Sequence, residues 1–178
     1  SDAKRKGPIK GIILDLRNNP GGILPEAISI AGSFVNTDEI VTYTLNKDGD
    51  RKDYRAEHSD DSAFIKDIPI IILTNSGSAS ASEVLSGALR DLGIAKTLGE
   101  KTFGKGIVQT VMGIGTSGIL TVTTDRYYTP KGVCIHGVGI EPDYSVEMSD
   151  EKTARLTTLD ASEDDQLKEA IKILKENK

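Results

Sequence analysis

The chain has 178 residues, enough for one domain with a sizeable core, and its 22 Lys and Arg against 27 Asp and Glu give a net charge of −5. This acidic balance argues against a nucleic-acid backbone or an anionic membrane as the main partner, because both require clustered basic surface. Hydrophobic residues make up 37% of the chain, which is typical of a folded protein, and the single Cys excludes an intrachain disulfide.

The first half of the chain predicts a strand, a helix and a hairpin in that order. Residues 9–16 form an apolar run that ends in the turn RNNPGG, as a buried strand does. Over residues 25–34 the apolar side chains fall at helical spacing. Residues 39–45 alternate like a half-buried strand, and the dipeptide at 48–49, Asp-Gly, is typical of a hairpin turn. The polar residues 56–62 predict a loop.

The order strand, small-residue turn, helix then occurs a second time. Residues 68–74 form another apolar run, which ends in NSGSASAS. A helix over residues 84–92 follows, and Gly93 is its stop signal. Two such units predict crossover connections between parallel strands that lie side by side.

The last third predicts one more strand and a terminal helix. Residues 119–128 are β-rich, and an amphipathic helix follows a start signal at Ser162, with Asp165 three residues later. Because no low-complexity linker interrupts residues 1–178, we expect a single α/β domain.

The turn after the second strand places Ser78, Ser80 and Ser82 at the start of a helix. Unpaired N–H groups at a helix start can bind an anion or a developing oxyanion. A plain N-cap explains the segment too, because Ser is a preferred capping residue and Glu83 lies in the first turn. Capping alone does not explain why three hydroxyls are present.

A nucleophilic Ser needs a base, and the histidines give weak candidates. His136 lies in a Gly-rich stretch and could complete a triad, but no local motif supports it. Cys134 is better explained as a small buried hydrophobe than as a nucleophile. Metal sites formed by His58 with Asp60 and Asp61, or by His136 with Asp143, are weak candidates, because an exposed loop explains these residues better.

A lysine is the other candidate base. Lys105 is flanked by glycines in TFGKGIVQ, beside apolar residues, whereas most lysines in the chain lie among other charges. An apolar setting would favour the neutral amine, which is the form that accepts a proton. The alternative is a lysine whose side chain extends from a glycine turn into water.

The chain resembles the carboxyl-terminal processing (tail-specific) serine protease family in three segments: IILDLRNNPGG, SGSASASEVLSGALRDLGIAKTLGEKTFGKGIVQT, and YYTPKG followed by GVGIEPD. The resemblance implies that Ser80, the middle serine of SASAS, is the nucleophile. It implies that Lys105, 25 residues later, is the general base. It also implies that Gln109 orients the lysine. An extended strand would put the two residues about 13 Å apart, so this role needs a turn or bulge between them.

The resemblance further implies an oxyanion hole made by the amide of Ala81 and a glycine amide of NNPGG, either Gly21 or, preferably, Gly22. The implied fold is α/β, a spiral of ββα units of the ClpP/crotonase kind. The implied reaction is cleavage of protein substrates at or near their C-terminal tails, with no metal or organic cofactor.

The chain departs from the family pattern at its N-terminus, where a PDZ domain, a core strand and a core helix are not present. We therefore expect a shortened catalytic core with weak activity or none, an open sheet edge, and a possible homodimer. The resemblance suggests an exported, periplasmic or cell-envelope protein, although the residues given carry no targeting signal. The alternatives are a non-catalytic peptide-binding module of the same fold and a crotonase-like acyl-CoA enzyme.

Overall fold

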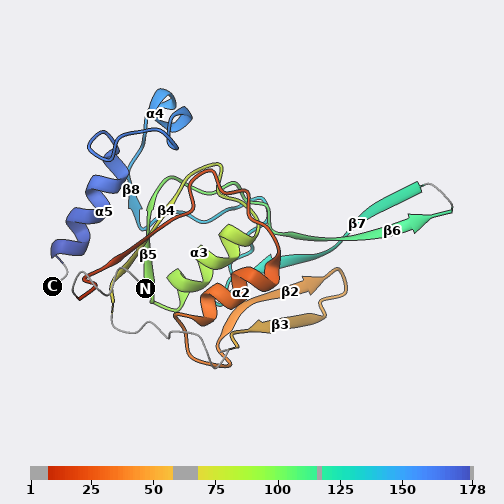
Figure 1. The fold of residues 1–178 in the computed structure, drawn as a ribbon. Coiled ribbons are helices and arrows are strands. Elements are labelled where there is room, and N and C mark those ends of the chain that lie inside the picture. Colours follow the sequence, from red (N-terminus) through yellow and green to blue (C-terminus); the bar gives the residue numbers. More distant parts are fainter. Residues whose placement is uncertain (1–7, 58–67, 116–117, 177–178) are drawn as a thin grey trace.

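The chain folds into two sheets with helices packed against them (Figure 1). The computed structural model describes residues 8–57, 68–115 and 118–176. The elements in chain order are β1 (Ile12–Asp15), α2 (Leu24–Gly32), β2 (Ile40–Asn46), β3 (Arg51–Arg55), β4 (Ile70–Thr74), α3 (Ala81–Asp91), β5 (Ala95–Gly99), β6 (Ile107–Ile114), β7 (Gly118–Tyr128), β8 (Tyr144–Ser145), α4 (Asp150–Ala154) and α5 (Asp165–Glu176).

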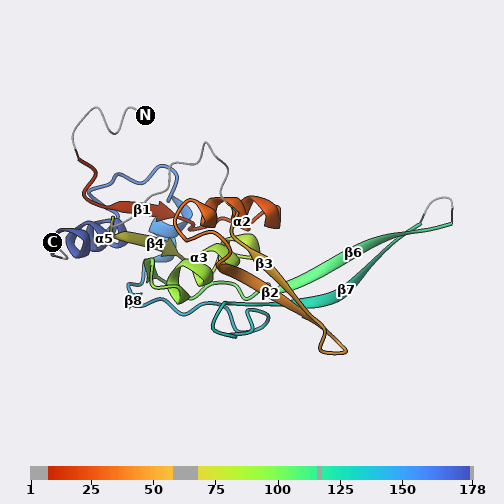
Figure 2. The same ribbon diagram turned by 90° about the horizontal axis from the view of Figure 1, so that it is seen from below.

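The first sheet is parallel, with strand order β1-β4-β5-β8 (Figure 2). β1 and β4 are neighbours, paired from Ile12 with Ile70 to Asp15 with Leu73. This confirms the prediction that the two strand–turn–helix units lie side by side. Because the strands are parallel, the turns that follow them meet at the same edge of the sheet.

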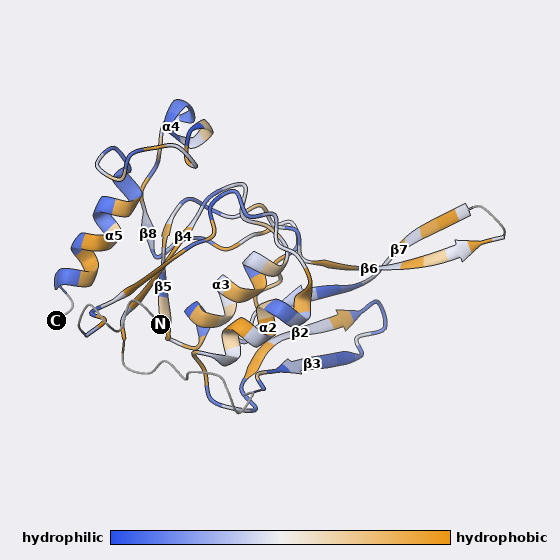
Figure 3. Cartoon of the chain, in the orientation of Figure 1, coloured by the Kyte–Doolittle hydropathy of each residue, from blue (hydrophilic) through white to orange (hydrophobic). Residues whose placement is uncertain are grey.

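The second sheet is antiparallel, with strand order β3-β2-β7-β6. β2 and β3 form the predicted hairpin, with Gly49 at φ +87° in its turn. β6 and β7 extend away from the body as a two-stranded arm (Figures 1 and 2). Figure 3 shows apolar residues on this arm, and the exposed ones include Val111, Met112, Ile114, Ile119, Leu120 and Val122.

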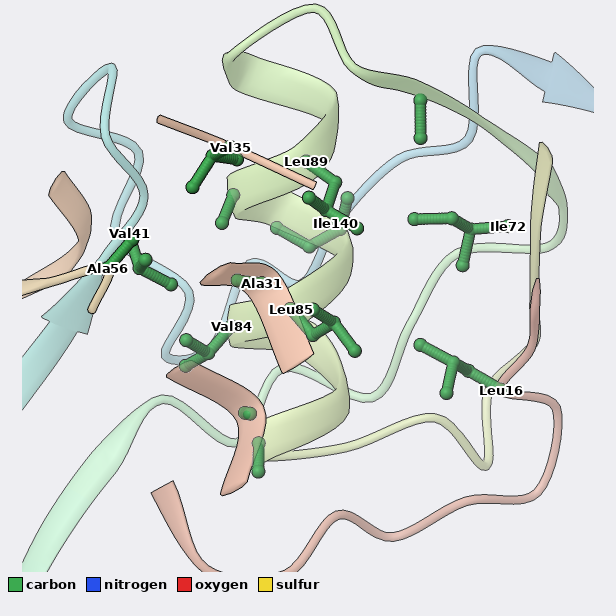
Figure 4. Close-up of a cluster of buried hydrophobic side chains, with 14 of the residues drawn as sticks. Leu16, Ala31, Val35, Val41, Ala56, Ile72, Val84, Leu85, Leu89 and Ile140 are labelled. Atoms are coloured by element: carbon green, nitrogen blue, oxygen red, sulfur yellow. The ribbon is translucent and has the colours of Figure 1, made fainter. Parts of the chain in front are cut away.

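β4 is buried on both faces, which explains why its sequence is a continuous apolar run. Side chains alternate along a strand, so Ile70 and Ile72 contribute to the main core formed with α2 and α3 (Figure 4). Ile71 and Leu73 point the other way, into a smaller cluster with α5. The strand is therefore held between α3 on one side and α5 on the other.

The predicted elements are all present among the described residues, with shifted ends. The predicted start of the terminal helix at Ser162 is wrong: Asp164 caps α5, accepting the Leu167 N–H at 2.9 Å, while Ser162 hydrogen-bonds to Asp160. β5 and β6 were not predicted, because Lys96 and Thr97 interrupt the apolar pattern of β5, and Gln109 and Thr110 interrupt that of β6. Residues 58–62 of the predicted loop lie outside the described residues.

No helix in the described ranges is both long and apolar enough to cross a membrane.

A buried ion pair joins the end of the first strand to the terminal helix. Arg17 Nη2 lies 2.8 Å from Asp164 Oδ2, and the two side chains are only 5% and 7% exposed. Burial opposes ionisation of the Asp164 carboxyl, but hydrogen bonds from Arg17 and from the Leu167 amide outweigh it and lower its pKa below the ordinary value. This pair therefore stabilises the fold in the pH range where Asp164 is ionised.

We expect Asp164→Asn to lower the free energy of unfolding by about 1.5–3 kcal/mol at neutral pH, because a charge-assisted hydrogen bond is lost. The folded pKa of Asp164 is lowered, so its stabilisation is present above the unfolded pKa of about 3.9 and is lost as the pH falls through the folded value. Urea unfolding of both proteins at a series of pH values measures the difference. A difference that stays constant down to the most acid pH would contradict this assignment.

Candidate active site

The turn between β4 and α3 holds Ser80 in an unusual backbone conformation. Ser80 is the N-cap of α3 and has φ +57° and ψ −119°, a region that non-glycine residues rarely adopt. Its side chain is only partly buried, at the edge of the parallel sheet where the turns meet. A serine fixed by the backbone at the start of a helix and open to solvent has the setting expected of a nucleophile.

The serine two residues before it has a structural role instead. Ser78 is fully buried; its hydroxyl donates to the Leu16 carbonyl at 2.7 Å and accepts the Asn75 N–H at 3.0 Å. Ser78 thus joins the end of β1 to the turn after β4. Ser82 is also buried, inside the first turn of α3. Ser80 is the most accessible serine of SASAS.

Two asparagines connect the NNPGG turn to the serine turn. Asn18 donates its N–H to Asn75 Oδ1 at 2.9 Å and accepts the Asn75 side-chain amide at 2.9 Å. The Asn19 carbonyl accepts the Ala79 N–H at 3.0 Å. These hydrogen bonds fix the two turns relative to each other.

Of the two glycines of NNPGG, Gly21 lies against the serine turn, whereas a side chain at Gly22 would meet no atom within 4 Å. A side chain at Gly21, which has φ +85°, would come within 2.7 Å of the Ala81 nitrogen, so only glycine fits. The Gly21 N–H is already donated to Asn19 Oδ1 at 2.9 Å. Among the described residues the N–H groups of Gly22 and Ala81 have no acceptor. The Gly22 and Ala81 amides are therefore available to a ligand, whereas the Gly21 amide is not.

Glu83 ties the serine turn to the lysine turn. Its side chain is completely buried, and Oε2 accepts the Ser80 N–H at 2.9 Å and the Lys105 N–H at 2.8 Å. The two amide nitrogens are therefore no farther apart than the sum of these distances. Oε1 accepts the Thr102 hydroxyl at 2.5 Å and the Gly104 N–H at 2.7 Å.

The sequence pattern identified Glu83 only as a first-turn carboxylate. The contact with Ser80 could have been predicted, because Glu83 follows Ser80 by three residues and Ser-x-x-Glu is a capping-box pattern. The other contacts reach residues 102–105, a connection that depends on the fold and has no local signal.

The prediction that Lys105 lies in an apolar setting is wrong, because its side chain is exposed. Gly104 and Gly106 are buried, whereas Lys105 and Phe103 are exposed. A side chain at Gly106 would come within 2.5 Å of the His136 nitrogen, so the glycines pack the turn closely against the following segment. The backbone of Lys105 is fixed, and its side chain extends outward.

Gln109 lies in β6 and is exposed. The register shift beside it places the extra residue on β7, so the path from Lys105 to Gln109 has no bulge of its own. Within the described ranges, no hydrogen bond joins the side chain of Lys105 to that of Ser80 or Gln109. The structure brings the Ser80 and Lys105 backbones together and leaves Gln109 on the strand beyond.

The alternative candidates gain no support. His136 is exposed and, in the described part of the chain, its side chain forms no hydrogen bond with Ser80. Cys134 is partly buried, with Sγ 3.9 Å from the His136 carbonyl. No group of three or more His, Cys, Asp or Glu among the described residues could hold a metal ion, and His58 lies outside them.

A cavity of about 250 Å³ opens beside the two free amides. Its lining is mainly apolar and comes from α2, α3 and the NNPGG turn, including Gly22, Ile23, Ala27, Ile30, Ala81 and Leu85. An apolar cavity of this size next to two N–H donors can accept an aliphatic group attached to a carbonyl.

Comparison with known proteins gives concordant matches. The family model described as Peptidase family S41 matches residues 2–146. A carboxy-terminal-processing protease of Bartonella bacilliformis is 48% identical over 139 residues, 78% of this chain and 31% of that protein. A probable CtpA-like serine protease of Staphylococcus saprophyticus is 47% identical over 142 residues, 80% of this chain and 28% of that protein. This chain spans less than a third of both relatives.

Among solved structures, the photosystem II D1 C-terminal processing protease superposes with a TM-score of 0.74 at 35% identity, over 90% of this chain and 42% of that one. This similarity agrees with the mixed α/β fold predicted from the sequence.

We expect Glu83→Ala to destabilise the protein by several kcal/mol, because it leaves buried donors without an acceptor, at about 1–3 kcal/mol each. Denaturant unfolding measures the loss. Glu26→Ala is the matched control, since Glu26 also lies in the first turn of a helix, α2, but is exposed. Equal stabilities of the two variants would contradict the role assigned to Glu83.

Proposed function

Because the chain belongs to peptidase family S41, we propose that it carries the catalytic machinery of a serine endopeptidase that cleaves proteins at or near their C-terminal tails by a Ser-Lys mechanism. The observation that carries this proposal is the shared Glu83 oxygen, which holds the backbones of Ser80 and Lys105 together. The N–H groups of Ala81 and Gly22, which have no acceptor among the described residues and line one cavity, support it.

In the proposed reaction, Ser80 Oγ attacks the carbonyl carbon of the scissile peptide while neutral Lys105 Nζ takes the hydroxyl proton. The carbonyl oxygen becomes an oxyanion that accepts hydrogen bonds from the Ala81 and Gly22 amides. The tetrahedral intermediate expels the amine, which receives the proton from Lys105. Water then attacks the acyl-enzyme, with Lys105 again taking and returning a proton, and Ser80 is regenerated.

The exposed Lys105 side chain must swing toward Ser80 for this reaction, and its fixed backbone limits the movement to side-chain rotation. A bound substrate would cover the lysine and supply the apolar setting that favours the neutral amine. We assign Gln109 the role of orienting the lysine. That role requires both long side chains to extend toward each other, because β6 is extended between them.

The apolar cavity beside Gly22 and Ala81 supports a preference for a small aliphatic side chain immediately before the scissile bond.

The expected partners are protein or peptide substrates, and a second copy of the chain at the β1 edge of the parallel sheet. An exported or cell-envelope location is proposed from the family resemblance alone. The two alternatives, a non-catalytic peptide-binding module and a crotonase-like acyl-CoA enzyme, are not favoured, because the chain belongs to a peptidase family and neither gives Lys105 a chemical role.

We expect Ser80→Ala to abolish peptide hydrolysis and labelling by a fluorophosphonate, while its thermal unfolding stays close to that of the wild type. Ser80 is partly exposed and lies outside the core, so loss of its hydroxyl leaves no buried cavity. Ser78→Ala is the control: it should retain labelling but lose about 1–3 kcal/mol of stability, because two buried partners lose their hydrogen bond. Labelling of the Ser80→Ala variant at the wild-type rate would contradict the proposal that Ser80 is the nucleophile.

Lys105→Arg should be inactive although it keeps the positive charge, because arginine cannot give up its proton to act as a base. The matched control is Lys101→Arg, an exposed lysine in the same segment that pairs with Glu141 at 2.7 Å. Turnover of a peptide substrate by both variants decides the matter. Wild-type turnover by Lys105→Arg would remove the lysine from the mechanism.

A further inference from the structure

Asp164 lies at the start of α5, beyond the segment matched by the family model, yet it contacts the residue that precedes the NNPGG turn. We propose that Asp164 is a positioning residue for catalysis: it holds Arg17 and, through Arg17, the backbone that presents the Gly22 amide to the oxyanion. This inference rests on the proposed peptidase function.

The guanidinium of Arg17 uses all its N–H groups. On one side it donates from Nε to Asp15 Oδ1 at 2.9 Å and from Nη2 to Asp15 Oδ2 at 2.6 Å. On the other side Nη1 and Nη2 donate to Asp164 Oδ1 and Oδ2 at 3.0 and 2.8 Å, and Nη1 also donates to Gln166 Oε1 at 3.1 Å. A guanidinium held in this bidentate way has little rotational freedom.

Asp15 and Asp164 both bind Arg17, but only Asp164 connects it to another element of the fold. The Asp15 side chain is half exposed and lies at the end of β1, only two residues before Arg17, so it cannot anchor Arg17 to another element. The Asp164 side chain is 7% exposed and also accepts the Leu167 N–H at the start of α5. Asp164 therefore connects Arg17 to a helix, and that helix is packed on β4 through Ala170 and Ile173.

Gln166 strengthens the same connection. It is 1% exposed, and its Nε2 donates to the Val146 carbonyl at 2.7 Å while its Oε1 accepts from Arg17. Asp164 and Gln166, at the start of α5, thus both accept hydrogen bonds from Arg17. Gln166 also binds this end of the helix to the segment after β8.

Arg17 directly precedes the NNPGG turn, so fixing Arg17 also restricts the backbone of this turn. Arg17 precedes Asn18, which has φ +55° and is bound to Asn75. Asn19 follows, and its side chain holds the Gly21 N–H. A positive φ at a non-glycine residue persists only where its surroundings fix it. Without the contacts that hold Arg17, the backbone of Asn18 and Asn19 could change conformation. The Gly22 N–H would then no longer point at the proposed oxyanion position.

The test compares Asp164→Asn with Asp165→Asn. Asp165 is the adjacent helix residue, and it pairs with Lys152 and Lys168 on the surface instead of with Arg17. Three quantities are measured on the folded proteins: kcat and KM for a peptide substrate, the rate of fluorophosphonate labelling, and amide hydrogen exchange over residues 18–23.

For Asp164→Asn we expect kcat to fall about 10- to 100-fold, since full loss of one oxyanion donor costs about 10²–10³. KM should change less than about twofold, because substrate contacts are kept. Labelling should slow in parallel, and residues 18–23 should exchange faster while β2 and β3 do not. Asp164→Glu should recover part of the rate, and Asp165→Asn should match the wild type.

A folded Asp164→Asn protein with wild-type kcat, labelling and exchange would overturn the inference. So would a loss of rate that active-site titration attributes entirely to unfolded molecules. If the wild type neither hydrolyses peptides nor is labelled, the proposed function fails instead, and the exchange measurement still decides whether Asp164 holds the turn. Should Asp164→Asn not fold, Asp164→Glu carries the same measurements.

Discussion

A carboxylate without solvent exposure is stable only when protein donors replace the water around its oxygens, and at Glu83 two elements supply these donors together. One donor comes from the serine turn, and the others come from residues 102–105. Neither turn can satisfy Glu83 alone. The requirement to pair a buried charge therefore brings the proposed nucleophile and base together, although 25 residues separate them in the chain.

The parallel sheet supplies the second constraint. β1 and β4 pair in register, so NNPGG and SGSAS emerge side by side from one edge. Cross-links between the turns then fix details that strand pairing leaves open, such as the Asn18–Asn75 pair and the Ser78 bond to Leu16. This explains the small, polar composition of both turns: close backbone approach requires glycine, and buried backbone groups require side-chain partners.

The sequence predicts well what depends on local pattern. The strand–turn–helix units, the hairpin at residues 48–49 and a serine-rich cap before the second helix all follow from periodicity and turn chemistry. It predicts poorly what depends on tertiary contact. Lys105 was expected in an apolar setting because of its neighbours in sequence, but Gly104 and Gly106 take the buried positions and the lysine extends outward. The cap of α5 was misplaced because Asp164 competes with Ser162, and its partner Arg17 lies 147 residues away.

Arg17 and Glu83 fix the proposed oxyanion hole from opposite sides. Glu83, in the first turn of α3, holds the serine turn, and Arg17 holds the start of the glycine turn against Asp164 at the start of α5. An oxyanion hole works because its donors are aimed before the reaction begins, so that no reorganisation is needed when charge develops. Both anchors are buried ionic side chains whose partners come from other elements, and such contacts cost much to break. The turns that carry the two amides are thus tied to buried side chains, while Lys105, the proposed base, has an exposed side chain on a backbone that Glu83 holds.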